Sequence, residues 1–309
     1  MNTKDHSLLV EKYRSKDLSE YVGNEHIKTQ IQKYLDQDDI QNFIFYGPAG
    51  TGKTTLAKLI VNNLECDYLY VNASDERGIE TIRDKVTSFS STMSFKKIKV
   101  VILDEADFLT IQAQASLRNT IETFSRNTRF ILTCNFIERI IDPLQSRCQV
   151  LKIVPPSKKE VAKHIKGILD KEKTKFEIEA LVNIVNKHHP DIRKMLNTIQ
   201  LSTQNNELVV DESILVSSNY IKQIIEELKL KKTDFKKLRQ IIADSQVRDF
   251  EELYRALFDH ASEYAIGREG SIAIILNEHQ YHSNFRIDKE VNIASALAKI
   301  IEIKKPQVI

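Results

Sequence analysis

The segment Gly47–Thr54, with the sequence GPAGTGKT, constrains the fold of this chain more than any other. It matches the pattern G-x-x-x-x-G-K-[ST], in which backbone N–H groups of a glycine-rich turn surround phosphate groups. An apolar run, residues 43–46, precedes it, and residues 56–61 continue as an apolar run. A strand, this turn and a helix form the context that a phosphate-binding loop needs, because the helix dipole favours an anion. We therefore expect nucleotide binding; a chance GKT in an ordinary strand–turn–helix connection is the alternative.

The end of this loop carries two side chains with expected roles. Lys53 would reach the β- and γ-phosphates of ATP, and the Thr54 hydroxyl would ligate Mg²⁺. The residues expected to surround the phosphates are Gly47, Pro48, Ala49, Gly50, Thr51, Gly52, Lys53, Thr54 and Thr55.

Apolar runs typical of buried strands recur along the first half of the chain, and segments with helical spacing separate them. The expected strands are residues 43–46, 68–72, 99–103, 129–134 and 149–154. A helix opened by Ser74 to Gly78 is expected to carry an apolar stripe of Ile79, Ile82, Val86, Phe89 and Met93. This alternation predicts an α/β domain: a parallel five-stranded sheet with helices on both faces.

Two prolines, Pro155 and Pro156, mark the expected end of the first domain, residues 1–154. Ser157 and Glu160 then form a capping-box pattern that starts a helix. Residues 155–217 show helical spacing and no strand pattern, which predicts a small helical domain. Residues 218–309 read as a further all-helical domain that opens with an amphipathic helix.

Composition excludes several classes of protein. Hydrophobic residues at 41% and charged residues at 28% are typical of a globular protein, and a net charge of +2 does not indicate strong nucleic-acid binding by one chain. The three cysteines lack zinc-ligand spacing and argue against a disulfide framework. Neither a signal peptide nor a membrane span is apparent, so we expect a cytoplasmic protein with no membrane partner.

Polar residues follow the ends of two expected strands. Asp104 and Glu105 come after residues 99–103, and Asn135 comes after residues 129–134. The carboxyl ends of parallel strands form the edge where α/β sheets bind ligands. Asp104 would hold Mg²⁺, and Glu105 would polarise a water for attack on the γ-phosphate. Asn135 would form a hydrogen bond with the γ-phosphate or with the attacking water. The alternatives are two helix-capping acids and a turn-initiating asparagine.

Arginines at two positions are candidates for contact with the γ-phosphate. Arg147 lies in a loop, where an arginine is usually a solvated charge, but it could complete the site of a neighbouring subunit. Arg193 follows Pro190 and Asp191 at the start of a helix and could read the γ-phosphate from the second domain.

Several motifs occur in a defined order through residue 200. They are EKYR at 11–14, GPAGTGKT at 47–54, NASDERG at 72–78, DEAD at 104–107, SRC at 146–148 and PDIR at 190–193. This set resembles the AAA+ ATPase subunits of sliding-clamp loaders, and SRC makes the resemblance specific within AAA+ proteins. NEHQYH at 277–282 also resembles the large clamp-loader subunit of T-even-like bacteriophages. Ser15 departs from the proline of many family members, and the four-cysteine zinc module of bacterial loaders is absent.

The resemblance implies an AAA+ module with an ATPase domain (1–154) and a helical lid (155–217), followed by a helical collar (218–309) that closes the oligomer. It also implies roles for single residues. Asn135 would be sensor 1, Arg193 would be sensor 2, and Arg147 would be an arginine finger acting in trans. The adenine pocket would be lined by Val10, Tyr13, Arg14 and Val22.

Regulatory and DNA-binding roles also follow from the resemblance. Asn72 would restrain Glu105 until DNA is bound, and Gln114 and Arg118 would couple neighbouring sites. The residues that would face the DNA backbone are Arg77, Arg83 and Lys85, for which a solvated helix face is the alternative. The end of the same helix, residues 89–95, is where the family contacts the clamp.

The function implied by the resemblance is an ATPase that opens a sliding clamp when ATP is bound and releases it on primer–template DNA upon hydrolysis. The partners would be the clamp, the DNA, identical subunits and a small companion subunit in a pentamer, in the cytoplasm of a bacterial host if phage-encoded. Another AAA+ DNA motor, such as a branch-migration helicase or a helicase loader, is one alternative. Another alternative is a subunit that binds ATP only to stabilise the assembly and does not hydrolyse it. The presence of Lys53, Asp104, Glu105 and Arg147 in this chain counts against that alternative.

Overall fold

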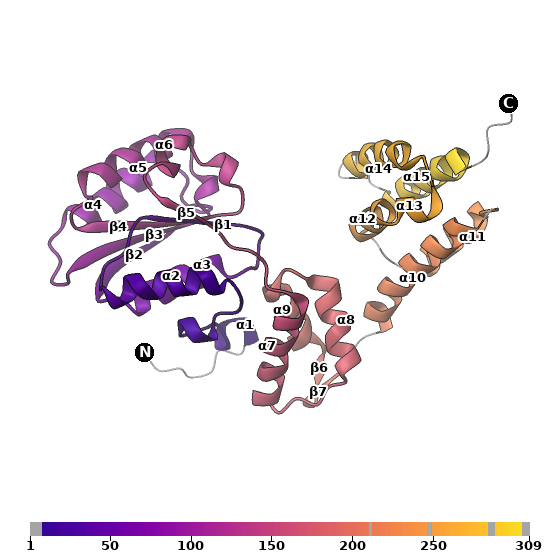
Figure 1. Ribbon diagram of the computed structural model, residues 1–309, viewed down its shortest axis with the longest axis horizontal. Coiled ribbons are helices and arrows are strands. Elements are labelled where there is room, and N and C mark those ends of the chain that lie inside the picture. The colour runs from indigo at the N-terminus through magenta and orange to yellow at the C-terminus, as the bar shows by residue number, and fades with distance from the viewer. Residues whose placement is uncertain are drawn as a thin grey trace. The chain divides into compact units, whose positions relative to one another are not determined.

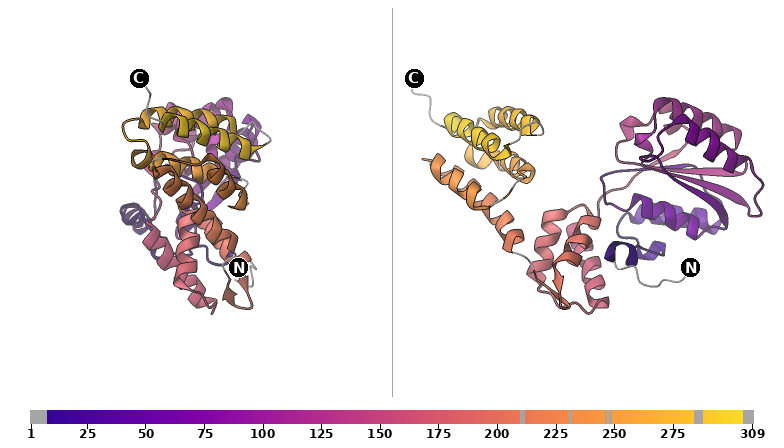
Figure 2. Two further views of the ribbon diagram at one scale, coloured as in Figure 1. Left: turned by 90° about the vertical axis from the view of Figure 1, so that its right-hand side faces the viewer. Right: turned by 180° about the vertical axis from the view of Figure 1, so that it is seen from behind.

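The computed structural model describes residues 8–209, 212–230, 232–245, 247, 249–283 and 288–304, without the side chains of residues 212–219. The chain divides into two compact units, Met1–Val209 and Val210–Ile309. Figures 1 and 2 show the elements of each unit. The expected boundary between residues 217 and 218 falls inside one helix, α10 (Glu212–Lys229).

The first unit contains a parallel five-stranded sheet with the order β2-β3-β4-β1-β5. Its strands are β1 (Phe43–Tyr46), β2 (Cys66–Asn72), β3 (Ile98–Asp104), β4 (Thr128–Cys134) and β5 (Gln149–Lys152). Helices α2 (Glu25–Asp36) and α3 (Lys53–Asn62) cover one face (Figure 1). The other face is covered by α4 (Ser88–Ser91), α5 (Ile111–Thr123) and α6 (Asp142–Gln145). The predicted fold class is therefore confirmed.

Strand β3 shows why the apolar runs predict a sheet buried on both faces. Successive side chains point to opposite faces of a strand. Val100 and Ile102 lie in the core with α2 and α3, whereas Val101 and Leu103 lie in the core with α5. Every residue of β3 is buried, while the edge strand β2 exposes Tyr68 and Tyr70.

The helix predicted after Ser74 was placed wrongly at both ends. Helical residues run only from 79 to 91, and Thr81–Thr87 has π-helical hydrogen bonding. Ser74 is used in a turn, because its N–H and hydroxyl both donate to Asn72 Oδ1 at 3.0 Å. At the other end, Thr92 is extended, so Met93 leaves the apolar stripe and is fully exposed.

The second half of the first unit consists of α7 (Lys158–Lys171), α8 (Ile178–His188) and α9 (Ile192–Ser202). The expected capping box is present: Glu160 N donates to Ser157 Oγ at 3.3 Å, and Ser157 N donates to Glu160 Oε2 at 2.8 Å. The expectation of no strand was wrong, because β6 (Thr203–Gln204) and β7 (Glu207–Leu208) form an antiparallel hairpin. Asn205 and Asn206 both have positive φ, as a two-residue type I′ hairpin turn requires.

An N-terminal arm joins the two halves of this unit. It contains α1 (Leu9–Lys12) and the 3₁₀ turn η1 (Leu18–Glu20). Leu9 N donates to Gln200 Oε1 at 2.9 Å, and the hydroxyl of Tyr13 donates to Glu172 Oε1 on the lid side. Further short 3₁₀ turns follow β3 and β4, namely η3 (Ala106–Phe108) and η4 (Ile137–Arg139).

The second unit is all-helical in its described residues. It comprises α10 (Glu212–Lys229), α11 (Phe235–Ser245), α12 (Glu251–Asp259), α13 (Ala261–Tyr264), α14 (Glu269–Ser283) and α15 (Lys289–Lys304). Asn292 is fully buried in this unit, and its side chain donates to the Tyr254 hydroxyl at 2.9 Å and to His279 O at 2.7 Å. Within the parts of the chain described, no helix combines the length and apolar character that crossing a membrane requires.

Candidate nucleotide-hydrolysis site

The phosphate loop connects β1 to α3, and all three of its glycines have a positive φ that other residues rarely adopt; Gly47 has φ +152°. Gly50 has φ +72° and Gly52 has φ +93°. A β-carbon at Gly50 would lie 2.0 Å from Asp191 Oδ1, and one at Gly52 would lie 3.0 Å from the Tyr21 ring. Glycine is therefore required at both positions by backbone conformation and by packing. The loop amides stand at the N-terminal end of α3, where an anion is favoured.

Lys53 is buried, with 8% of its surface exposed. Its ammonium donates to Gly47 O, Pro48 O and Asn135 Oδ1, each at 2.8 Å. Burial is the main cause that lowers the pKa of this amine. The loop lysine and the asparagine that follows β4 thus meet, although 82 positions separate them in the sequence.

Asp104 stands at the carboxyl end of β3, next to the loop. Its Oδ1 accepts from the Thr54 hydroxyl at 2.7 Å and also from the Thr133 hydroxyl. Its Oδ2 accepts from the Tyr70 hydroxyl at 2.7 Å. Thr54 and Asp104 offer adjacent hard oxygen atoms, which fits Mg²⁺. Among the described residues, no group of three or more His, Cys, Asp or Glu side chains could hold a metal ion.

Glu105 follows directly in the left-handed conformation, with φ +56°. Such a conformation costs roughly 1–2 kcal/mol for a residue other than glycine. Its N–H donates to the Thr133 hydroxyl at 3.1 Å, which fixes the backbone, and its side chain lines the cavity at the loop. Backbone strain of this kind is concentrated at functional sites.

Asp107 supports the same edge of the sheet. Its Oδ2 accepts from Asn135 N at 3.2 Å and from Phe136 N at 3.3 Å, which holds the segment after β4. Its Oδ1 is buried without a hydrogen-bond partner in the described part of the chain. The last acidic residue of the DEAD motif therefore positions Asn135.

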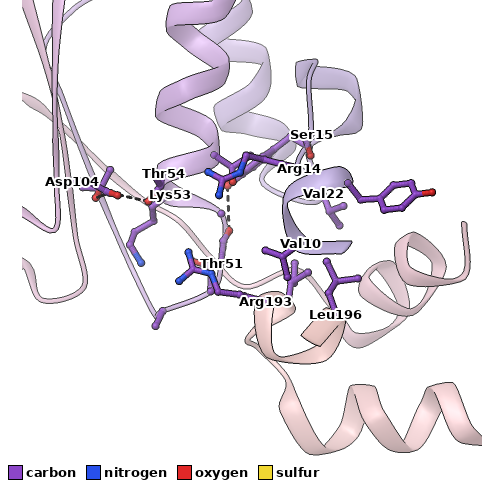
Figure 3. Close-up of a pocket in the computed structure, with 18 of the residues that line it drawn as sticks. Val10, Arg14, Ser15, Val22, Thr51, Lys53, Thr54, Asp104, Arg193 and Leu196 are labelled. Atoms are coloured by element: carbon purple, nitrogen blue, oxygen red, sulfur yellow. Dashed lines mark hydrogen bonds between the residues drawn. The ribbon is translucent and has the colours of Figure 1, made fainter. Parts of the chain in front are cut away.

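One cavity collects most of the predicted site residues (Figure 3). The N-terminal arm contributes Val10, Tyr13, Arg14 and Val22, and α9 contributes Ile192, Arg193 and Leu196. The loop residues that line it are Ala49, Gly50, Thr51, Gly52, Lys53, Thr54 and Thr55, together with Asp104, Glu105 and Asn135. Gly47 and Pro48 do not line it; their carbonyls hold Lys53 instead.

Further residues line this cavity without having been predicted to do so. They are Ser15, Tyr21, Thr133, Cys134, His164, Ile192 and Leu196. Burial raises the pKa of the Cys134 thiol to about 12 and lowers that of His164. Thr133 was within reach of prediction, because it lies near the end of β4, two positions before Asn135; His164 on α7 gave no signal.

Arg147 does not line the cavity of its own chain. Its guanidinium pairs with Glu122, and its Nη1 donates to Pro143 O at 2.7 Å. It lies beside another depression with Asn42, Arg129 and Gln149.

Gln114 and Arg118 lie one helical turn apart on α5 but have separate partners. Gln114 is 1% exposed; it donates to Leu109 O and Arg139 O and accepts from Ile141 N at 2.9 Å. Arg118 Nη2 donates to Asn119 Oδ1 at 2.9 Å. Gln114 therefore fixes the segment around η4.

The candidate DNA-binding residues are exposed on and before the π-helical segment η2. Arg77 lies 5.0 Å from the Phe108 ring centroid, and Lys85 pairs with Glu76 at 2.6 Å. Asn72 accepts from Ser74, and no hydrogen bond between described residues joins it to Glu105.

The fold and the site together define an AAA+ ATPase, and residues 43–156 match the ATPase family associated with various cellular activities (AAA). Replication factor C small subunits from Sulfolobus acidocaldarius and Saccharolobus solfataricus are both 33% identical, over 95% and 97% of this chain and 95% and 96% of their own. That of Halobacterium salinarum is 40% identical over 66% of each chain. The chain belongs to the replication factor C small-subunit family of AAA+ clamp-loader subunits.

The solved structure of the Thermotoga maritima RuvB Holliday junction branch migration motor has a TM-score of 0.54 at 18% identity. The match covers 81% of this chain and 80% of that one. A likeness at this identity shows a shared AAA+ fold and does not extend to branch migration.

Proposed function

We propose that this chain hydrolyses ATP as part of a sliding-clamp loader: ATP binding opens the clamp, and primer–template DNA triggers hydrolysis that releases it. The observation that carries this proposal is the convergence of the phosphate loop, Asp104, Glu105, Asn135 and Arg193 on one cavity. A family member that bound ATP without hydrolysing it would not need the acidic pair Asp104 and Glu105 together with Asn135 at the carboxyl edge of the sheet.

In this proposal each side chain acts where the geometry places it. Lys53 and Arg193 offset the charge on the β- and γ-phosphates, and Asn135 orients the attacking water. Thr54 and Asp104 would hold Mg²⁺, which, when bound, neutralises charge on the phosphates. Glu105 accepts the proton of the water, and its fixed backbone keeps the carboxylate at the cavity. The adenine ring would be bound by residues of the N-terminal arm, namely Val10, Tyr13, Arg14 and Val22.

Arg147 would act on the ATP of a neighbouring subunit. It lies outside its own cavity, and its present partner, Glu122, is half-exposed. An exposed ion pair contributes about 0–1 kcal/mol, so a transition-state phosphate can displace it. An arginine supplied in trans adds charge stabilisation only once the subunits are assembled.

DNA contact would use Arg77, Arg83 and Lys85, which follow the phosphate backbone rather than base edges. The Lys85–Glu76 pair is exposed and can yield to a DNA phosphate. Asn72 would restrain Glu105 by donating from its Nδ2, because its Oδ1 already accepts from Ser74. Gln114 would couple neighbouring ATP sites through its hydrogen bonds to the segment around η4. Arg118 would contribute to this coupling through contacts of its own.

The proposed organisation is an ATPase domain, residues 1–154, a lid, residues 155–217, and a collar, residues 218–309. Identical subunits and a small companion would complete a pentamer in the cytoplasm. The narrower assignment to a phage-type loader rests on residues 277–282 in α14. One of them, His279, is buried against Asn292, so part of this motif serves the collar core.

An ATPase assay with clamp and primer–template DNA, added separately and together, tests the proposal. Synergy between them is expected, and Glu105→Gln is the control without hydrolysis. Stimulation by DNA with indifference to the clamp would favour another AAA+ DNA motor.

A further inference from the structure

Lys99 is a buried lysine in the first half of β3, between Ile98 and Val100. Only 2% of its surface is exposed, and it is among the largest fully buried side chains. Removing an ammonium group from water is unfavourable unless hydrogen bonds replace its hydration. Lys99 must therefore have partners that the apolar strand itself does not supply.

Those partners lie at the C-terminal end of α4. Lys99 Nζ donates to Phe89 O at 2.7 Å, to Thr92 Oγ1 at 2.8 Å and to Thr92 O. It also lies 5.1 Å from the Phe89 ring centroid. The end of a helix leaves carbonyls without partners and carries the negative end of the helix dipole, so a cation is favoured there.

The segment that begins at Thr92 presents two apolar side chains to solvent. Met93 is 98% exposed and Phe95 is 106% exposed. Between them, Ser94 Oγ donates to Asp67 Oδ2 at 2.7 Å. The segment is thus attached to the sheet on both sides: by Lys99 where it leaves α4 and by Ser94 where it passes β2.

We propose that Lys99 is a positioning residue for the clamp contact: its ammonium fixes the end of α4 so that Met93 and Phe95 face the clamp. The inference rests on the proposed function and on the expectation, implied by the family resemblance, that residues 89–95 contact the sliding clamp. Strand β3 also ends in Asp104 and is followed by Glu105, so one buried strand holds both the clamp-facing segment and the catalytic carboxylates.

Lys99→Met in the full chain tests this proposal, because methionine keeps the length of the side chain and removes the donor. Clamp affinity is expected to fall about tenfold, as for loss of one well-held anchor. ATP affinity and hydrolysis without clamp should stay unchanged. Lys97→Met, at an exposed position paired with Asp38, is the matched control and should bind clamp normally. Unchanged clamp affinity in Lys99→Met would overturn the proposal.

A double-mutant cycle with Phe95→Ala separates positioning from a general structural role. If Lys99 acts through the segment, the double variant should bind clamp no more weakly than the weaker single variant, whereas additive losses would overturn the proposal. Thr92→Val, at an exposed position, removes one acceptor of Lys99 and also the hydrogen bond that Thr92 Oγ1 donates to Phe89 O. Clamp affinity should fall partly in this variant even if Lys99→Met fails to fold, and wild-type clamp affinity in Thr92→Val would count against the proposal. If Phe95→Ala binds clamp normally, the clamp contact itself lies elsewhere, and the role of Lys99 falls with it.

Discussion

Gly50→Ala tests how closely the phosphate loop and the lid are fitted together. Gly50 has φ +72°, where a β-carbon costs roughly 1–2 kcal/mol. The new carbon would lie 2.0 Å from Asp191 Oδ1, which caps α9 by accepting from Lys194 N at 3.0 Å. Losing such a cap costs about 1 kcal/mol. We therefore expect the free energy of unfolding to fall by about 2–3 kcal/mol.

The same substitution should weaken ATP binding. Ile192 N donates to Gly50 O at 3.3 Å, so displacing Asp191 also displaces the start of α9 and with it Arg193. Loss of one charged contact, about 1.4 kcal/mol, corresponds to about tenfold in affinity.

Urea unfolding followed by circular dichroism measures the first effect, and binding of a fluorescent ATP analogue measures the second. Gly167→Ala is the control, because this glycine lies in α7 with open space around it. Its replacement by alanine should raise the free energy of unfolding by up to about 1 kcal/mol. Combining Gly50→Ala with Asp191→Ala should cost less than the sum, since the clash is removed with the carboxylate. Additive costs, or wild-type stability of Gly50→Ala, would refute the reasoning.

Four further outcomes are expected. Glu105→Gln should bind ATP and assemble but hydrolyse it at least about a hundredfold more slowly, measured by phosphate release; unchanged hydrolysis would remove Glu105 from the mechanism. Arg147→Ala should lower hydrolysis and spare nucleotide binding, and mixing it with Glu105→Gln subunits should restore mixed-site activity if the arginine acts in trans. Charge reversal of Arg77 and Arg83 should reduce DNA stimulation with a shallower salt dependence, whereas an unchanged DNA response would favour a solvated face. Burial holds the pKa of His164 below its ordinary 6.5, so stability present above that pH should be lost as pH falls toward the folded-state value. His164→Gln should flatten this decline in thermal midpoints between pH 8 and 5.5.

The sheet was predictable because its signals are local. Runs such as Val100–Leu103 are apolar on both faces, and the phosphate loop fixed where the first strand ends. The hairpin at residues 203–208 was missed, although Asn205-Asn206 is a turn signal, because its strands are too short to show alternation. The predicted helix that carries Met93 was too long, because apolar spacing alone does not show that the backbone becomes extended at Thr92.

Site residues were predictable where polar side chains stand at or directly after the ends of apolar strands, as for Asp104, Glu105 and Asn135. What could not be predicted were contacts that depend on which elements pack together. Tyr70 reaches Asp104 because β2 and β3 are adjacent, and Tyr21 reaches Thr51 O because the arm folds over the loop. Lys99 gave no signal, since its acceptors are backbone groups and a hydroxyl of a neighbouring helix end.

Strand order also has a consequence for synthesis of the chain. β1, which leads into the phosphate loop, pairs with β4 and β5, and Phe43 has Ile131 and Gln149 as its partners. Pairings this distant in sequence form late, because a long intervening chain must first be ordered. On the ribosome the GKT sequence therefore emerges well before its supporting strands. A nascent chain should not retain ATP until β5 has left the exit tunnel.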